Sequence, residues 1–483
     1  MNCKLLVVAL SLVPAILFAQ QPMQLSLQDA LNIAKEKSAL SKNIKAQYKS
    51  IQYGFRSFMS SLKPQLSVSG VLPTYDSRLD NVIQPDGSYK VQSISRSNIS
   101  ANFLLEQNLF WTGGSVFVSS NLSQLVNRQT IRQEQWQTTP LAIGIRQPLN
   151  LYNSVKWNYR QEKLRMTSAT KEQIENFEDL SVQITQTYFD LYVANMELQN
   201  ARQNEQINDT LYKISTGRFN VGKIAENELL QIELQLMNAK NAVNQSEVRV
   251  TVHTKKLKNL LGMDNTAPIE ILPVTDAPLV EVETVTAIKE AKENRSDIVN
   301  FELQENEATM RVKRSKGNQF ASGDIYLSYG LNQTAPTLSD AYKDHLKATQ
   351  VNIGYSIPLV GWGKNRNEVA SSKQNLEAVK ARLDYNRKNF DIDIENTVNQ
   401  FKQLQASLLI AAKSDTIAQK RYDVARNRYL LGKISITDLG LAQDAKDKAL
   451  IDYTRTLQQY WVAFYNLRRI TLYDFQKKEK ISY

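Results

Sequence analysis

Few side chains in this sequence have the types and spacing that chemistry requires. His253 and His345 are the only histidines, they lie far apart in the chain, and neither has a metal-ligand spacing. Cys3, the only cysteine, precedes an apolar run near the amino terminus. The sequence has no Gly-rich phosphate loop and no Ser or Cys nucleophile motif. Carboxylates are scattered along polar helical segments, which indicates solvent-exposed helix faces. We therefore predict a protein that is not an enzyme and that uses no metal and no cofactor.

Residues 1–19 have the pattern of a secretory signal peptide. Lys4 is followed by an apolar run from Leu5 to Phe18, and Ala19 provides a small residue at the cleavage position. The run is short for a membrane-spanning helix. Cleavage after Ala19 would remove Cys3 and leave no cysteine for a disulfide. No second apolar stretch is long enough for a spanning helix, so a mature chain in a membrane would have to cross it as strands closed into a barrel.

The formal net charge of +11 raises the question of a nucleic-acid or acidic partner. The basic residues, however, are spread along helical segments among Glu, Asp, Gln and Asn, and no basic block is interleaved with aromatic residues. We interpret them as solvated helix faces and predict no binding to nucleic acid.

The chain contains the same pattern twice. The segment Arg218–Ile224 (RFNVGKI) recurs at Arg428–Ile434 (RYLLGKI), a shift of 210 residues, and Gln147-Pro148-Leu149 recurs as Ile357-Pro358-Leu359 at the same shift. The beginnings match at a shift of 257, so the first copy has about 47 additional residues in its strand-rich region. We predict a first repeat at 20–270, a linker at 271–283, a second repeat at 284–475 and a basic tail at 476–483.

Each repeat has the pattern of a helix, strands, a long helix, a turn and another helix. Alternating apolar and polar residues predict strands within about 64–149 and about 320–358. Helices are expected at 26–62, 154–216 and 224–261 in the first repeat and at 296–318, 365–429 and 434–471 in the second. The late part of the first helix, Ser38 to Leu62, and the helix after the turn together match the long helix in length, and 296–318 with 434–471 matches 365–429 in the second repeat. This is typical of a coiled-coil rod or a helical tube.

The strands indicate an oligomer. We expect four to six strands in one chain, whereas bacterial membrane barrels have about eight or more and lipid excludes an open sheet edge. Several copies would have to share one barrel. Trp157 and Trp362 lie near the junctions between strands and helices, where they would be interfacial aromatic anchors or ordinary packing residues.

With these features in hand, the chain resembles the TolC-like outer-membrane efflux channel family, the outer membrane factors of tripartite pumps. The resemblance rests on the segment YFDLYVANMELQNAR at 188–202, on LSLQDALNIAKEKS at 25–38, and on the two Arg-aromatic-x-x-Gly-Lys turns. It extends over essentially the whole mature chain, and two copies in register make it specific.

The resemblance implies an α+β membrane protein with a two-fold internal repeat in the outer membrane of a Gram-negative bacterium. Three identical chains would form a transmembrane β-barrel in outer-membrane lipid, continued by a long α-helical, coiled-coil-like tunnel in the periplasm. The channel would be a passive duct for efflux or type I secretion, docked on a periplasmic membrane-fusion adaptor and an inner-membrane pump of the RND or ABC type.

The resemblance also implies roles for residues at the two turns, which match the tips of the family's helical hairpins. Docking on the adaptor would involve Arg218, Gly222, Lys223, Arg428, Gly432 and Lys433, and we favour this role over the alternative that the turns are structural stops alone. A periplasmic gate would involve Glu228, Asp438 and Tyr429, with each carboxylate forming a ring of three like charges in a trimer. Alternatively, the carboxylates cap helices, since Ser435-x-x-Asp438 has the spacing of a capping box. Gln231 and Leu441 stand where some members have a second carboxylate.

An alternative class is a trimeric coiled-coil structural or adhesin protein of the cell envelope. Such a protein does not require amphipathic strands between two matched helical copies, or a tip turn repeated at one offset, so these features favour the channel.

Overall fold

The computed structural model describes residues 23–128, 132–149, 152–264, 268–274, 277–319 and 321–483. The predicted signal peptide at 1–19 lies outside these residues. The chain forms two compact units. A helical unit comprises the described residues of Met1–Ala46, Gln173–Asn294 and Asp393–Tyr483, and a sheet unit comprises those of Gln47–Glu172 and Arg295–Ile392.

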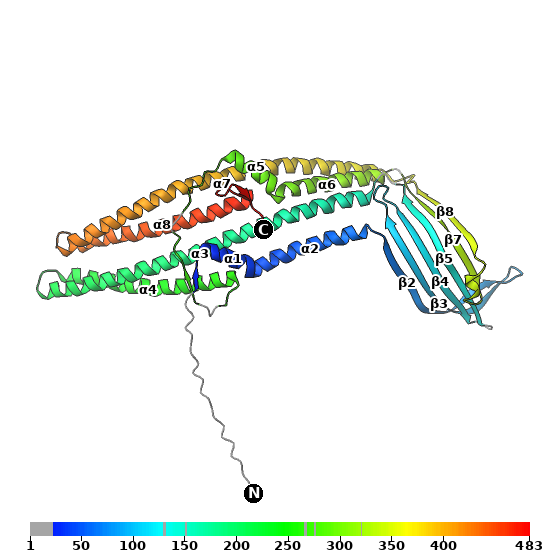
Figure 1. The fold of residues 1–483 in the computed structure, drawn as a ribbon, viewed down its shortest axis with the longest axis horizontal. Coiled ribbons are helices and arrows are strands. Elements are labelled where there is room, and N and C mark those ends of the chain that lie inside the picture. Colours follow the sequence, from blue (N-terminus) through cyan, green and yellow to red (C-terminus); the bar gives the residue numbers. More distant parts are fainter. Residues whose placement is uncertain (1–22, 129–131, 150–151, 265–267, 275–276, 320) are drawn as a thin grey trace, which may run out of the picture. The chain divides into compact units, whose positions relative to one another are not determined.

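Helices account for most of the described chain (Figure 1). Their bounds are α1 Leu27–Lys37, α2 Ala39–Ser61, α3 Ser154–Asn220, α4 Glu226–Leu261, α5 Thr284–Asn294, α6 Ser296–Gly317, α7 Lys364–Leu430 and α8 Ile436–Thr471, with a short 3-10 turn η1 at Asp340–Tyr342. The helices α3 and α7 have 67 residues each, and α4 and α8 have 36 each, so the two repeats match in helix length. Among the described residues, no helix combines the length and the apolar character needed to cross a membrane.

The helix predicted at 26–62 is in fact two helices, which is a correction to the sequence-based expectation. Ser38 has an extended backbone, with φ −62° and ψ 150°, and its amide bonds the carbonyl of Ala34. Its hydroxyl accepts a hydrogen bond from the amide of Ser41 at 2.9 Å. Ser38 therefore ends α1 and caps the start of α2, a use of serine that competes with a continuous helix.

The helical unit contains α4, α8 and the later parts of α3 and α7, which form the tips of the two hairpins α3–α4 and α7–α8. It also contains a small parallel pair of strands, β1 (Met23–Leu25) with β6 (Ile269–Ile271). The hydroxyl of Tyr188, in α3, lies 3.0 Å from the carbonyl oxygen of Leu25 and 2.7 Å from that of Leu272. This hydroxyl thus anchors the strand pair to a long helix. Burial raises the pKa of Tyr188 well above its usual range.

The carboxyl-terminal segment folds back on the helical unit through a short antiparallel pair, β9 (Tyr473–Asp474) with β10 (Glu479–Lys480). The carboxylate of Glu178 in α3 is fully buried and accepts hydrogen bonds from Arg468 in α8, at 3.1 and 3.3 Å, and from the Tyr483 hydroxyl. Arg468 also pairs with Asp474. A buried carboxylate needs such partners, and here they connect the first repeat, the second repeat and the tail.

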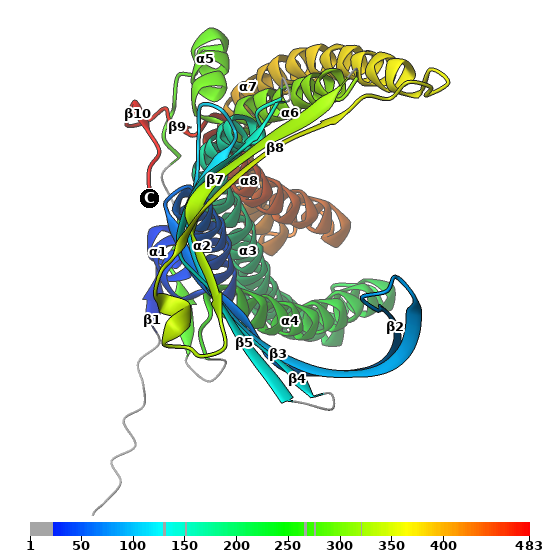
Figure 2. The ribbon, with the colours of Figure 1, turned by 90° about the vertical axis from the view of Figure 1, so that its right-hand side faces the viewer.

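The sheet unit contains one six-stranded antiparallel sheet in the order β2-β3-β4-β5-β7-β8 (Figure 2). The strands are β2 Gln65–Ile83, β3 Tyr89–Asn108, β4 Ser115–Arg128, β5 Arg132–Pro148, β7 Ser322–Ala335 and β8 Leu346–Ser356. Four strands come from the first repeat and two from the second, so an additional pair of strands lies where the sequence has its additional residues. The edge strands β2 and β8 each have one pairing neighbour.

One face of the sheet is apolar and the other is mostly polar. In a soluble protein the apolar face of a sheet packs against a core, whereas here it is exposed. Residues paired across neighbouring strands lie on the same face, and one face carries Leu66 opposite Leu105, Val68 opposite Phe103, and Ile143 opposite Tyr329. These apolar side chains are all exposed. The other face carries mostly polar residues, such as Asn102 opposite Asn121. An extended apolar face exposed on a folded chain marks an interaction site.

Candidate docking and gate site at the helical tips

The tips of the two hairpins have the same backbone geometry. At the first tip, the amide of Gly222 bonds the carbonyl of Phe219 and the amide of Lys223 bonds that of Arg218, both at 2.8 Å. At the second, Gly432 bonds Tyr429 at 2.8 Å and Lys433 bonds Arg428 at 2.9 Å. The glycines have φ of +70° and +71°. This is the Schellman ending of a helix, which requires a left-handed residue and explains the glycine in both copies.

The side chain of Arg218 connects the first tip to the second. Its Nη2 donates a hydrogen bond to the carbonyl of Leu430 at 3.0 Å, and its guanidinium lies 5.8 Å from the centre of the Tyr429 ring. The equivalent residue, Arg428, is exposed and has no side-chain hydrogen bond, ion pair or ring contact in the described part of the chain. The repeat is therefore symmetric in backbone but asymmetric in this contact.

Tyr429, which the resemblance assigns to the gate, is 2% exposed in the single chain. Its ring belongs to a hydrophobic cluster between the two hairpins, and its hydroxyl lies 3.4 Å from that of Ser215. Tyr422 lies in the same cluster, and burial raises its pKa. The other buried members of the cluster are Leu211, Ile232, Ile436, Leu439 and Ala442.

The two carboxylates assigned to the gate have different surroundings. Asp438 accepts hydrogen bonds from the amide and hydroxyl of Ser435, at 3.2 and 2.8 Å, and its own amide bonds the Ser435 hydroxyl at 3.1 Å. Asp438 thus completes the capping box of α8 and remains exposed. Glu228 is in the first turn of α4, where Ala225 provides no side-chain cap. Its carboxylate has no partner among the residues that the structure describes.

Apolar side chains at the tips were not singled out from the sequence. Val221 and Leu431 are 67% and 69% exposed, and Phe219 and Leu430 are also exposed. A turn between two polar helices usually has polar residues. The apolar residues beside both tip glycines are therefore a feature of the sequence that indicates a contact surface at the tips. They give each tip an apolar contact surface next to the cationic Lys223 or Lys433.

The aromatic residues near the strand–helix junctions lie in the sheet unit. Trp362 is 93% exposed in the connection between β8 and α7, whereas Trp157, in the first turn of α3, is half-buried. Trp111, in the turn between β3 and β4, was not assigned to an interface from the sequence and is 85% exposed. Asn153 bonds the carbonyl oxygens of Phe110 and Trp111, at 2.9 and 3.1 Å, which places this turn beside the start of α3.

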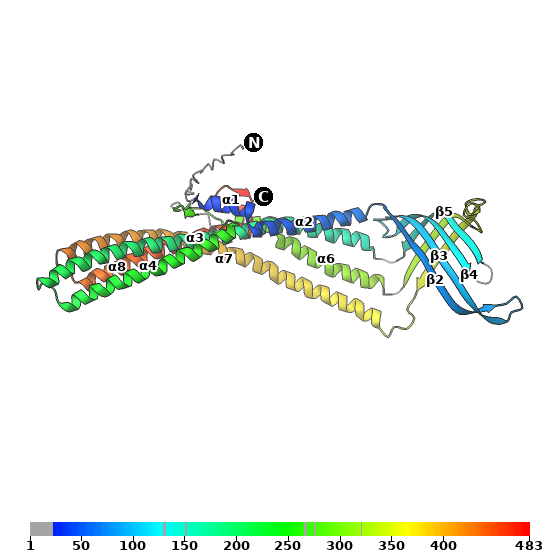
Figure 3. The same cartoon turned by 90° about the horizontal axis from the view of Figure 1, so that it is seen from below.

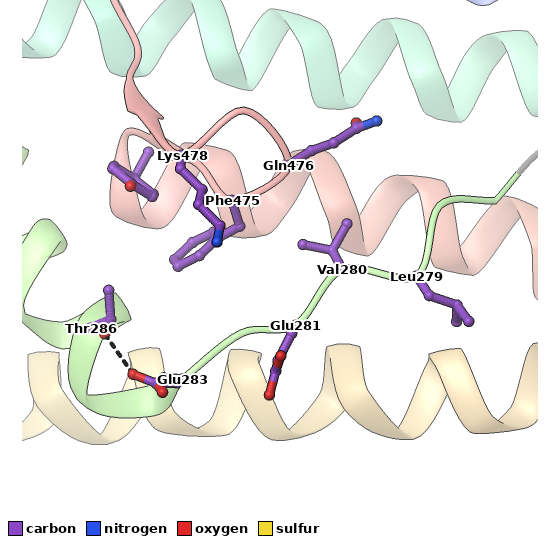
Figure 4. A pocket seen from close by; sticks show the side chains of 9 residues that line it. Leu279, Val280, Glu281, Glu283, Thr286, Phe475, Gln476 and Lys478 are labelled. Atoms are coloured by element: carbon purple, nitrogen blue, oxygen red, sulfur yellow. Dashed lines mark hydrogen bonds between the residues drawn. The ribbon is translucent and has the colours of Figure 1, made fainter.

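A cavity of about 480 Å³ lies in the helical unit between the linker and the carboxyl-terminal segment (Figure 4). Glu281, Glu283, Phe475 and Lys478 line it, and the Thr286 hydroxyl bonds Glu283 at 3.0 Å. No grouping of three or more His, Cys, Asp or Glu side chains with metal-site geometry occurs in the described segments.

Long paired helices, a sheet with an exposed apolar face and matched tips together define a fold shared with membrane channels. A family model described as outer membrane efflux protein matches residues 34–263 and 287–471. The chain belongs to this family, which confirms the resemblance. It is accordingly an outer-membrane efflux channel protein with its helical part in the periplasm. No curated protein matches the chain in sequence.

Solved structures of outer-membrane channels have the same fold. The Campylobacter jejuni CmeC outer membrane channel is 16% identical, with a TM-score of 0.68 over 92% of this chain and 85% of that chain. The Vibrio cholerae outer membrane protein VceC is 13% identical, with a TM-score of 0.66 over 92% and 95%. The open state of the Neisseria gonorrhoeae MtrE outer membrane channel is 13% identical, with a TM-score of 0.64 over 95% of this chain and 91% of that chain.

Proposed function

We propose that three copies of this chain form one passive duct. The observation that supports this most directly is the six-stranded sheet, which has two unpaired edges and an exposed apolar face. In lipid, an unpaired strand edge is too costly to persist. Because the strand number is even and every pairing is antiparallel, β8 of one copy can pair with β2 of the next without breaking the alternation. Three copies would give a barrel of eighteen strands.

The test is the mass of the purified full-length protein in detergent, measured by light scattering, together with its conductance in planar bilayers. We expect a protein mass three times that of one chain and discrete channels of uniform size. A monodisperse monomer without channel activity would contradict the proposal.

The duct would dock on a periplasmic adaptor, and through it on an inner-membrane pump of the RND or ABC type. The matched tips support this assignment, since each presents exposed apolar side chains beside a lysine on a rigid turn. Gly432→Pro cannot adopt the φ of +71° and is expected to weaken capture of the adaptor while trimers persist. Normal capture by this variant would argue against docking at the tips.

The gate at the periplasmic end would use Glu228 and Asp438, whose charges form two rings in a trimer. Because Asp438 also caps α8, the variant Asp438→Asn is preferable to alanine, since the amide oxygen can still accept from Ser435. We expect Glu228→Gln with Asp438→Asn to increase single-channel conductance and reduce cation selectivity. Glu226→Gln, in the same first turn of α4, is the control. Unchanged conductance and selectivity in the double variant would remove the gate assignment.

A further inference from the structure

The excess positive charge of this chain is concentrated in the sheet unit. Four twelve-residue segments, 52–63, 154–165, 308–319 and 362–373, together contain thirteen Lys or Arg and two Glu. The remaining chain has 46 residues of each sign, so these segments account for the whole net charge of +11. The four segments are far apart in the sequence, where none of them forms a basic block by itself.

The topology brings the four segments to one rim of the sheet. The helices α2 and α6 end at the starts of β2 and β7, and α3 and α7 begin after the ends of β5 and β8. Because the strands alternate in direction, these four junctions lie at the same end of the sheet (Figures 1 and 3). We call the thirteen cationic residues the basic collar.

The cations of the basic collar are available to a partner. All thirteen side chains are exposed. Arg160, Arg165 and Arg311 contact the carboxylates of Glu302, Glu162 and Glu307, at 3.5, 2.8 and 2.7 Å. The other ten have no carboxylate within ion-pair distance among the described residues.

Between the basic collar and the apolar face lies a band of exposed apolar and aromatic residues. Leu359 and Trp362 are 90% and 93% exposed in the connection before α7, and Trp111 is 85% exposed in the neighbouring turn. Along the sheet unit the order is therefore apolar surface, tryptophan, cations. Tryptophan favours the boundary between acyl chains and headgroups, and clustered Lys and Arg just beyond it favour anionic lipid.

We infer that the basic collar binds the phosphate groups of anionic phospholipid in the leaflet facing the periplasm, and so fixes the depth of the channel in the membrane. This rests on the proposed function, because the apolar face must lie in the acyl region. Each cation near an anionic surface is expected to favour binding about fivefold. A zwitterionic surface offers no comparable attraction.

The test measures lipid selectivity by quenching of tryptophan fluorescence in reconstituted full-length protein. The vesicles contain phosphatidylcholine with either brominated phosphatidylcholine or brominated phosphatidylglycerol. For the natural sequence we expect phosphatidylglycerol to bind at least about fivefold more strongly, with the preference falling in high salt.

The collar variant is Arg314→Gln, Lys316→Gln, Lys364→Gln and Arg366→Gln, and its preference is expected to fall close to one. A matched control neutralises four exposed cations further along α7, through Lys402→Gln, Lys413→Gln, Lys420→Gln and Arg421→Gln, and should keep the preference.

Two outcomes would overturn the inference: equal binding of both lipids to the natural sequence, or equal loss in both variants. Flotation of the protein with the vesicles is measured first. Failure to float with either lipid refutes the proposed membrane channel itself, whereas flotation without selectivity refutes the collar alone.

Discussion

Removing the Arg218 side chain should loosen the contact between the two tips. Arg218→Ala deletes a cation–aromatic contact with Tyr429 at 5.8 Å and a hydrogen bond to the Leu430 carbonyl at 3.0 Å. A half-exposed contact of the first kind contributes about 0.5–1 kcal/mol, and the hydrogen bond contributes a similar amount. We therefore expect a loss of about 1–2 kcal/mol, which increases the population of separated tips about 5- to 30-fold.

Hydrogen exchange followed by mass spectrometry measures this opening directly, because tip amides exchange through local opening. Exchange of the peptide containing Gly432 and Lys433 should accelerate by that factor in Arg218→Ala. The internal repeat provides the control, since Arg428 is the equivalent residue and makes no such contact. Arg428→Ala should change the same rate by less than about twofold. Equal acceleration in both variants would refute the reasoning and would mean that general charge loss, not the contact, controls the tips.

Three further outcomes are expected. Gly222→Ala and Gly432→Ala should each lower the free energy of unfolding in urea by about 1–2 kcal/mol, because alanine disfavours the left-handed backbone. A Cβ at either site meets no atom within 4 Å, so the two losses should be equal. Unequal losses would indicate a contact at one tip. Glu178→Ala should lower the free energy of unfolding by about 3–5 kcal/mol, because it leaves Arg468 buried with one partner fewer, and Glu178→Gln should lower it less. A stability equal to that of the natural sequence would contradict the buried pairing. Gly144→Val should prevent assembly in the outer membrane, because a Cβ at this position overlaps the Phe117 ring. Gly54→Ala in α2 is the contrasting variant, because its Cβ meets no atom and should increase the free energy of unfolding by about 0.5–1 kcal/mol. Heat-modifiable migration on gels distinguishes an assembled variant from one that fails to assemble.

The sequence by itself determined the long helices, the tip turns and the family. These features depend on local signals, which are helical periodicity without Pro or Gly over long stretches and a glycine where a helix must end left-handed. The same signals occur twice at one offset, so each copy supports the assignment of the other. The break at Ser38 was missed because a serine can either continue a helix or cap one, and the choice depends on contacts beyond the local sequence.

Tertiary structure decided which residues meet across long distances in the chain. Strand pairing fixed the sheet at six strands, a number that alternation left between four and six, because loops and strand ends carry little local signal. It also brought to one rim of the sheet four cationic segments that are far apart in the sequence. The contact of Arg218 with Tyr429, present in one repeat and absent for Arg428, follows from packing of the two hairpins. Two copies with nearly the same local sequence have different neighbours, and only the folded chain distinguishes them.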